Sequence, residues 1–181
     1  MVGAAAVLAD EVGWEQLTLA GLAGRLGVRL PSLYKHIESL DGLRRDVAVL
    51  ALGELGAALG AAAIGRSGAD ALRALAGAYR GYARQHPGRY AATVRAPAPG
   101  DTDHDAAAGG VLRVVFAVLA GYGLTGDDAV DATRALRATL HGFVVLEAGG
   151  GFGMPVDVDR SYTRLVDGLE ATLSRWAATA T

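Results

Sequence analysis

The chain has 181 residues, of which 51% are hydrophobic, so it is long and apolar enough to bury a core and is not a disordered tail. It contains no cysteine, which excludes disulfides, thiol nucleophiles and thiolate metal sites. Its formal net charge of -2 gives the whole protein no attraction to nucleic acid, so any surface that binds DNA must be a local one.

We expect no apolar run to reach the roughly 18 residues that a membrane span needs, because charged residues or glycine interrupt each candidate. The first residues, MVGAAAVLADEVG, lack the basic region of a secretory signal. We therefore expect a cytoplasmic protein that does not associate with a membrane.

The first 45 residues predict three short helices. Thr18 is a favourable N-cap and Gly27 a favourable stop for the second helix, and Pro31 suits the first turn of the third. We expect these helices at residues 2–12, about 19–26 and about 30–37.

The remainder predicts six more helices and almost no strand, since valines fall within 3.6-residue periods and alternating runs are missing. The stretch APAPGDTDHD, residues 96–105, is the best internal loop. We expect an all-α fold of about nine helices, with a helix-turn-helix head at residues 1–45 and a larger helical body at residues 46–181. The six later helices are expected at about 40–64, 69–86, 88–95, 104–122, 127–148 and 158–178.

The second and third helices have the pattern of a helix-turn-helix, in which a short helix enters the major groove, about 12 Å wide, braced by the helix before it. We expect Val28 to fill the turn and the apolar side of both helices to pack against the first helix. The residues expected on this buried side are Leu19, Leu22, Ala23, Leu26, Leu33 and Ile37, against Val7, Leu8, Val12 and Trp14.

The opposite side is expected to face DNA. No carboxylate occurs between Gln16 and Ile37, although Arg25 and the chain's only lysine, Lys35, lie there. Ammonium and phenol groups donate hydrogen bonds to phosphate oxygens, and an arginine at position 29 could instead grip guanine O6 and N7. The residues on this side are Arg29, Ser32, Lys35 and His36, with Tyr34 at the edge.

The segment GWEQLTLAGLAGRLGVRLPSLYKHIESLDGL, residues 13–43, resembles the helix-turn-helix of TetR-type bacterial repressors in its glycines, threonine cap, LYKHI stretch and following serine. The resemblance covers about 45 residues. It implies a three-helix DNA head and a divergent helical body that binds a small ligand and dimerises. It also implies the roles of six residues: phosphate contacts for Thr18, Tyr34 and His36, and contacts with bases or backbone for Arg29, Ser32 and Lys35.

Two departures from the family pattern affect the DNA head. Many members have a lysine directly after the serine that starts the fourth helix, whereas Leu40 follows Ser39 here, so we expect one backbone contact to be lost. Many members also have a basic arm before the first helix. Its absence predicts either a weak affinity or a truncated sequence.

The last helices combine small and large apolar residues, which allows close helix approach, and the resemblance implies a homodimer at this place. An ordinary buried core would explain the same pattern. The residues expected in the dimer interface are Ala135, Ala138, Gly142 and Leu146.

A pocket in the body would have apolar walls and a few polar groups, and its ligand would be small and mostly apolar. The alternative is that these aromatic residues are core residues, and that His141 is a hydrogen-bonded core histidine. The candidates for contact with an effector are Tyr79, Tyr82, Tyr90, Phe116, Tyr122, His141 and Phe143.

The sequence thus predicts a transcriptional regulator that binds a double-stranded DNA operator, and the family implies a repressor released by its effector. Two other classes remain open: a helical protein-interaction module, and an enzyme that uses the body. Reactive residues such as His86, His104, His141 and Glu147 match no nucleophile-elbow, HExxH or phosphate-loop motif. We expect no catalytic residue, no metal site and no cofactor.

Overall fold

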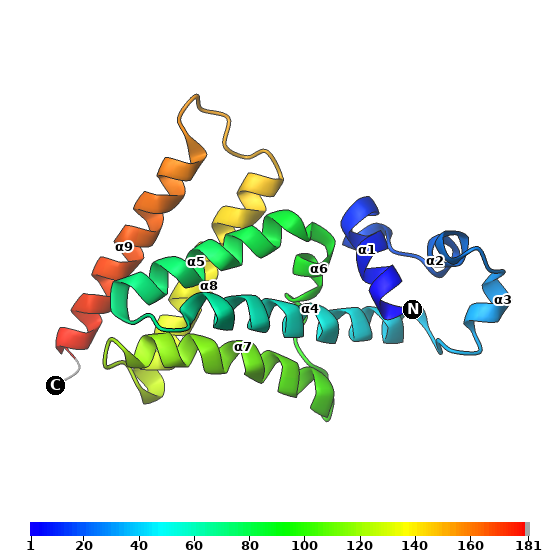
Figure 1. Ribbon diagram of the computed structural model, residues 1–181, viewed down its shortest axis with the longest axis horizontal. Coiled ribbons are helices and arrows are strands. Elements are labelled where there is room, and N and C mark those ends of the chain that lie inside the picture. The colour runs from blue at the N-terminus through cyan, green and yellow to red at the C-terminus, as the bar shows by residue number, and fades with distance from the viewer. Residues whose placement is uncertain (180–181) are drawn as a thin grey trace. The chain divides into compact units, whose positions relative to one another are not determined.

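The computed structural model describes residues 1–179, with side chains up to Trp176 (Figure 1). Over this range the protein has nine α-helices, one short 3-10 turn and no strand, so the predicted all-α fold is confirmed. The elements are α1 Val2–Val12, η1 Trp14–Gln16, α2 Leu19–Leu26, α3 Leu30–Leu33, α4 Leu40–Ala63, α5 Gly68–Gln85, α6 Pro87–Ala92, α7 Thr102–Ala120, α8 Gly126–Ala148 and α9 Val158–Thr179.

The predicted boundaries of α2 are confirmed by their hydrogen bonds. The hydroxyl of Thr18 accepts a hydrogen bond from the backbone N–H of Gly21 at 3.1 Å, which satisfies a free donor of the first turn. Gly27 ends the helix with φ 67° and ψ 26°, a left-handed conformation that glycine adopts without steric cost. The chain therefore turns sharply before α3.

Three predicted boundaries are wrong, one of them the end of α6, which lies at Ala92 rather than near residue 95. Helix α3 ends at Leu33 rather than near residue 37, and the chain continues as a turn in which the N–H of Ile37 donates to the carbonyl of Leu33 at 2.9 Å. Helix α7 begins at Thr102, inside the predicted loop. There the carboxylate of Asp101 accepts a hydrogen bond from the N–H of His104 at 3.1 Å and caps the helix.

The chain forms two compact units, each of which combines separate segments. One unit contains residues 1–56 and 85–111, and the other contains residues 57–84 and the chain from residue 112 onward. The first unit holds the whole predicted DNA head together with α6 and parts of α4 and α7. The functional boundary expected after residue 45 stays a prediction.

The core of the head forms from α1, α2, α3 and the first half of α4. The prediction for its apolar side is partly wrong, because Val12, Leu26 and Val28 are exposed. The left-handed turn at Gly27 redirects the chain directly after Leu26, so helical periodicity no longer decides which side chains face inward. The large residues that are buried are Leu8, Leu17, Leu22, Leu33, Ile37, Leu43 and Val47.

Helix α6 packs so closely against α1 that no side chain fits between the two backbones at Gly88. A Cβ atom built on Gly88 would lie 2.0 Å from the carbonyl oxygen of Ala9, so only glycine fits there. Beside it, the carboxylate of Asp10 accepts a hydrogen bond from the N–H of Arg89 at 2.8 Å, and the guanidinium of Arg89 reaches Glu54 at 3.2 Å. Helix α6 is thereby attached to both α1 and α4.

The second unit has its own leucine-rich core. Its helices are also linked by a buried phenol, because the hydroxyl of Tyr162 in α9 donates to the carbonyl of Ala76 in α5 at 2.6 Å. The fully buried leucines of this unit are Leu59, Leu72, Leu75, Leu119, Leu124, Leu140 and Leu173.

Helix α4 is long and apolar enough to cross a membrane, with a mean hydropathy of 1.6 over an 18-residue window. The expectation that no segment meets this measure is therefore wrong. Core helices of soluble proteins pass the same test, and α4 buries Leu43, Val47, Leu52 and Leu55 inside the first unit. Of that window 33% is buried, so packing accounts for part of its hydrophobicity.

Candidate DNA-binding surface and helical body

The predicted DNA contacts all lie at the surface of the first unit. Tyr34 is 57% exposed, and Thr18, whose hydroxyl caps α2, is an exposed residue. The short α3 presents its polar residues outward because Leu33, and Ile37 after it, point into the core. The exposed residues of the predicted site are Thr18, Arg29, Ser32, Tyr34, Lys35 and His36.

The cations of this surface differ in whether a carboxylate neutralises them. Arg25 does not remain free, since its guanidinium lies 2.5 Å from the carboxylate of Glu11 in α1. Within the described residues, Arg29, Lys35 and His36 form no ion pair. Two cations of this surface, Arg29 and Lys35, therefore have no carboxylate partner, whereas Arg25 is paired.

The start of α4 is held against the head by Arg44. Its guanidinium carbon lies 5.6 Å from the ring centroid of Trp14, and its Nη2 donates to the carbonyl of Glu15 at 3.2 Å. Ser39 caps α4, as predicted, by accepting a hydrogen bond from the N–H of Gly42 at 3.0 Å. These contacts fix the segment that follows α3.

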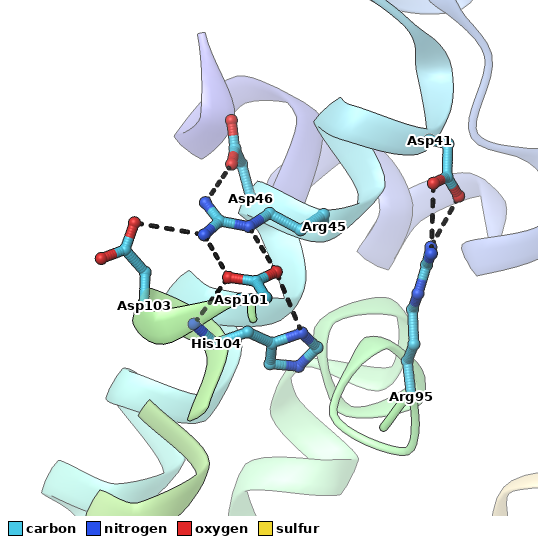
Figure 2. Close-up of polar contacts among 7 residues, drawn as sticks. All are labelled: Asp41, Arg45, Asp46, Arg95, Asp101, Asp103 and His104. Carbon is cyan, nitrogen blue, oxygen red and sulfur yellow. Dashed lines mark hydrogen bonds and ion pairs between the residues drawn. The ribbon is translucent and has the colours of Figure 1, made fainter. Parts of the chain in front are cut away.

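A second set of charges joins α4 to Asp101 and to the first turn of α7 (Figure 2). Arg45 donates to the carboxylates of Asp46, Asp101 and Asp103, and Asp101 is shared with His104. Hydrogen bonds from Arg45 hold the pKa of Asp101 well below its usual range. Asp101 therefore remains ionised through ordinary acidification.

A neighbouring ion pair joins Arg95, after α6, to Asp41 in the first turn of α4, with two hydrogen bonds of 2.7 and 3.1 Å (Figure 2). The hydrogen bond from Arg95 lowers the pKa of the Asp41 carboxyl. Both sets are interactions of the first unit, and sequence periodicity gave no sign of them.

The second unit contains one buried cation, Arg80 in α5, which is 9% exposed. It binds Glu147 of α8 through two hydrogen bonds of 2.8 and 2.5 Å and Asp159 of α9 through one of 2.7 Å. The rings of Tyr162 and Phe143 cover it, at 4.7 and 5.6 Å from the guanidinium carbon. Hydrogen bonding from Arg80 lowers the pKa of Glu147, so this buried pair stays ionised.

This arrangement shows the role of Glu147, for which the sequence suggested no partner. Its carboxylate is used by Arg80. Burial, with Arg137 as a further cause, lowers the pKa of His141. Among the described residues, no group of three or more histidine, aspartate or glutamate side chains is placed to hold a metal ion.

The candidate effector residues are not gathered in one environment. Tyr90 belongs to the first unit and the other six to the second. Phe143 packs against Phe152 and Tyr162, with ring centroids 4.7 and 4.9 Å away. The hydroxyl of Tyr122 is buried without a hydrogen-bond partner, and burial raises its pKa. The remaining candidates divide into buried Tyr82, half-buried Tyr79 and His141, and exposed Phe116.

The residues expected in the dimer interface all reach solvent on α8. Ala138 and Leu146 are exposed, whereas Ala135 and Gly142 are half-buried. A Cβ atom on Gly142 would meet no other atom within 4 Å, so this face is open in the single chain. The interface stays a prediction.

Comparisons with known proteins agree on one family. The family model described as "Tetracyclin repressor-like, C-terminal domain" matches residues 72–169. An uncharacterised HTH-type transcriptional regulator of Mycobacterium tuberculosis, Rv0681, is 41% identical over 176 residues, which are 97% of this chain and 80% of that protein. A second uncharacterised HTH-type transcriptional regulator, YobS of Bacillus subtilis, is 35% identical over 87% of this chain and 82% of its own.

Solved structures share the fold. A protein of unknown function from Rhodococcus sp. RHA1 is 27% identical, has a TM-score of 0.76 and covers 96% of this chain and 93% of its own. A TetR variant from Acinetobacter baumannii, solved in complex with minocycline, is 24% identical, with a TM-score of 0.72 over 97% of this chain and 95% of its own. At that identity the likeness extends to the fold alone.

Proposed function

The chain belongs to the TetR family of transcriptional regulators, and on that premise we propose that it is a homodimeric repressor. It binds an operator in double-stranded DNA and leaves it when a small, mostly apolar effector binds the helical body. It acts in the cytoplasm and catalyses no reaction. One observation carries the proposal: two exposed cations without carboxylate partners, Arg29 and Lys35, lie on the acid-free surface of a protein whose net charge is -2.

Each exposed group of this surface has a role that follows from its chemistry. Lys35, His36 and the phenol of Tyr34 donate to phosphate oxygens and fix the head on the DNA backbone. Arg29 has the planar fork that matches O6 and N7 of guanine. The hydroxyls of Thr18 and Ser32 add a phosphate contact and a contact with bases or backbone.

Dimerisation through α8 and α9 would give two heads for two half-sites in successive major grooves. The open face around Gly142 and the exposed Leu146 support this assignment. An effector would release DNA only if it binds more tightly to an arrangement of the heads that no longer matches the two grooves. The aromatic residues of the second unit and the unpartnered Tyr122 hydroxyl support a ligand site there.

The test is fluorescence anisotropy against a selected pool of DNA duplexes, titrated from low to physiological salt. The parent is compared with the double variant Tyr34→Phe plus Lys35→Ala, which removes a phenol and an ammonium from exposed positions. Arg113→Ala is the matched control, because Arg113 is an exposed cation of α7 with no ion pair in the described chain.

The proposal expects selective binding that weakens with salt, falls in the double variant and is unchanged in the control. Equal losses of DNA affinity in the control and the double variant would show that the change in net charge causes the effect, and not the loss of specific contacts. An absence of selective binding even at low salt would contradict the DNA-binding function and favour a helical protein-interaction module.

A further inference from the structure

Three large apolar side chains remain in solvent at the helix-turn-helix. Leu26, Val28 and Leu30 are 39%, 43% and 37% exposed. Val28 and Leu30 stand on either side of Arg29, the residue whose fork suits guanine. Exposed apolar residues within a surface that otherwise carries polar donors need an explanation.

The core of the head does not need these side chains. Helix α3 and the turn after it are anchored by Leu33 and Ile37, which are 2% and 8% exposed. None of the three exposed residues belongs to the hydrophobic cluster of the head or to the partly buried residues that pack against it. The exposed parts of these side chains are therefore available to a partner.

The surroundings indicate what would cover them. The stretch from Gln16 to Ile37 has no carboxylate, and the cations Arg29 and Lys35 form no ion pair in the described chain, so the surface complements a polyanion. In the major groove the apolar group presented by base edges is the C5-methyl of thymine, and aliphatic side chains contact it. A side chain directly beside a guanine-binding arginine is well placed to reach the neighbouring base pair.

We propose that Leu30, supported by Val28, contacts the C5-methyl group of a thymine that neighbours the guanine bound by Arg29. This inference rests on the DNA-binding function proposed above and adds a sequence requirement to it. Each half-site then contains a guanine next to a thymine whose methyl group contributes to affinity. Leu26, the last residue of α2, precedes the turn at Gly27 and takes no part in this contact.

The experiment replaces each thymine of the selected operator in turn by uracil, which removes the methyl group and leaves the base-pairing edge unchanged. The parent should lose affinity by about fourfold for each contacted methyl, the effect expected for one buried methyl or methylene group. Leu30→Ala should bind the thymine operator more weakly than the parent and should be insensitive to uracil at those positions. Leu26→Ala is the control, because it truncates an equally exposed leucine and should keep the full uracil effect.

The outcomes separate this inference from the proposed function. Selective binding by the parent that no uracil substitution weakens would overturn the methyl contact and leave the DNA-binding function standing. An unchanged uracil effect in Leu30→Ala would assign the contact to another residue and overturn the role of Leu30. If no variant binds any duplex selectively, the function itself fails. Circular dichroism melts would establish that each variant is folded, and truncation of an exposed leucine is expected to preserve folding.

Discussion

The cations of residues 27–37 and the buried cation of the second unit are in opposite environments. Arg29 and Lys35 are exposed, and no carboxylate in the described chain pairs with either. Arg80 is buried, is bound by Glu147 and Asp159, and lies under two aromatic rings. The first group is available to an outside anion, whereas Arg80 is fully used within its own unit.

The comparison shows that a count of arginines says little about DNA binding. The chain has sixteen arginines and one lysine, but several of the arginines are neutralised inside the fold. Arg25 shows this within the head, since it lies in the acid-free stretch and still pairs with Glu11 of α1. A carboxylate partner thus distinguishes a structural cation from an available one.

The largest expected effect tests the structural role of Arg80. Arg80→Ala leaves the mostly buried carboxylate of Glu147 without its guanidinium, and we expect it to lower the free energy of unfolding by about 3 kcal/mol. Arg84→Ala is the control, because Arg84 is exposed and lies 4.0 Å from Asp159, so its loss should cost less than about 1 kcal/mol. Urea unfolding of both variants measures the difference, and equal costs would show that Arg80 is not a special structural cation.

The next largest effect concerns DNA affinity at the free cations. Lys35→Ala should lower affinity at low salt and reduce the slope of log K against log salt by about 1 for each lost phosphate contact. Arg25→Ala should leave the slope unchanged, because Glu11 already neutralises that guanidinium. A slope that falls equally in both variants would contradict the distinction between paired and unpaired cations.

The distinction between paired and unpaired cations can be tested further by removing the carboxylate partner of a paired one. Glu11→Gln removes the carboxylate that holds Arg25 and should make the guanidinium available to DNA. We expect affinity to rise by about twofold to fivefold, the range of an exposed ion pair, and the salt dependence to steepen. The double variant Glu11→Gln plus Arg25→Ala has the net charge of the parent and should lose this gain; a gain that persists there would come from the loss of the Glu11 carboxylate itself and not from the release of Arg25.

The smallest effect is a pH dependence at Asp101. Its pKa is lower in the folded chain than in the unfolded chain, so its stabilising contribution is fully present above the unfolded pKa, about 3.9, and is lost only as the pH falls through the still lower folded pKa. The melting temperature of Asp101→Asn should therefore lie below that of the parent at pH 7, and the gap should begin to narrow only below about pH 4. Asp105→Asn, at an exposed position of the same helix start, is the control and should show no such convergence.

Local signals predicted much of the fold, because a cap or a left-handed glycine acts on its own neighbours. Thr18, Gly27 and Ser39 mark helix ends in the sequence, and each forms the expected cap. Helical periodicity predicted the inward face of α3 at Leu33 but assigned Leu26 and Val28 to the core, since it does not register the change of direction at Gly27.

Contacts between distant segments could not be predicted in this way. The partners of Arg80 lie 67 and 79 positions away, and no spacing rule connects them. The requirement for glycine at position 88 could not be predicted either, because it arises from the close approach of the α1 backbone. The roles of the six surface residues in DNA binding came from their chemistry and from the family resemblance, and they stay predictions.

The single exposed lysine has a practical consequence for experiments with this protein. Reagents that attack primary amines have one side chain to modify, Lys35, besides the terminal amine. A sensor surface coupled through amines would hold the protein by the face proposed to meet DNA, and it would report a loss of binding caused by the attachment. Immobilising the operator avoids this, because the ammonium of Lys35 then stays available to phosphate.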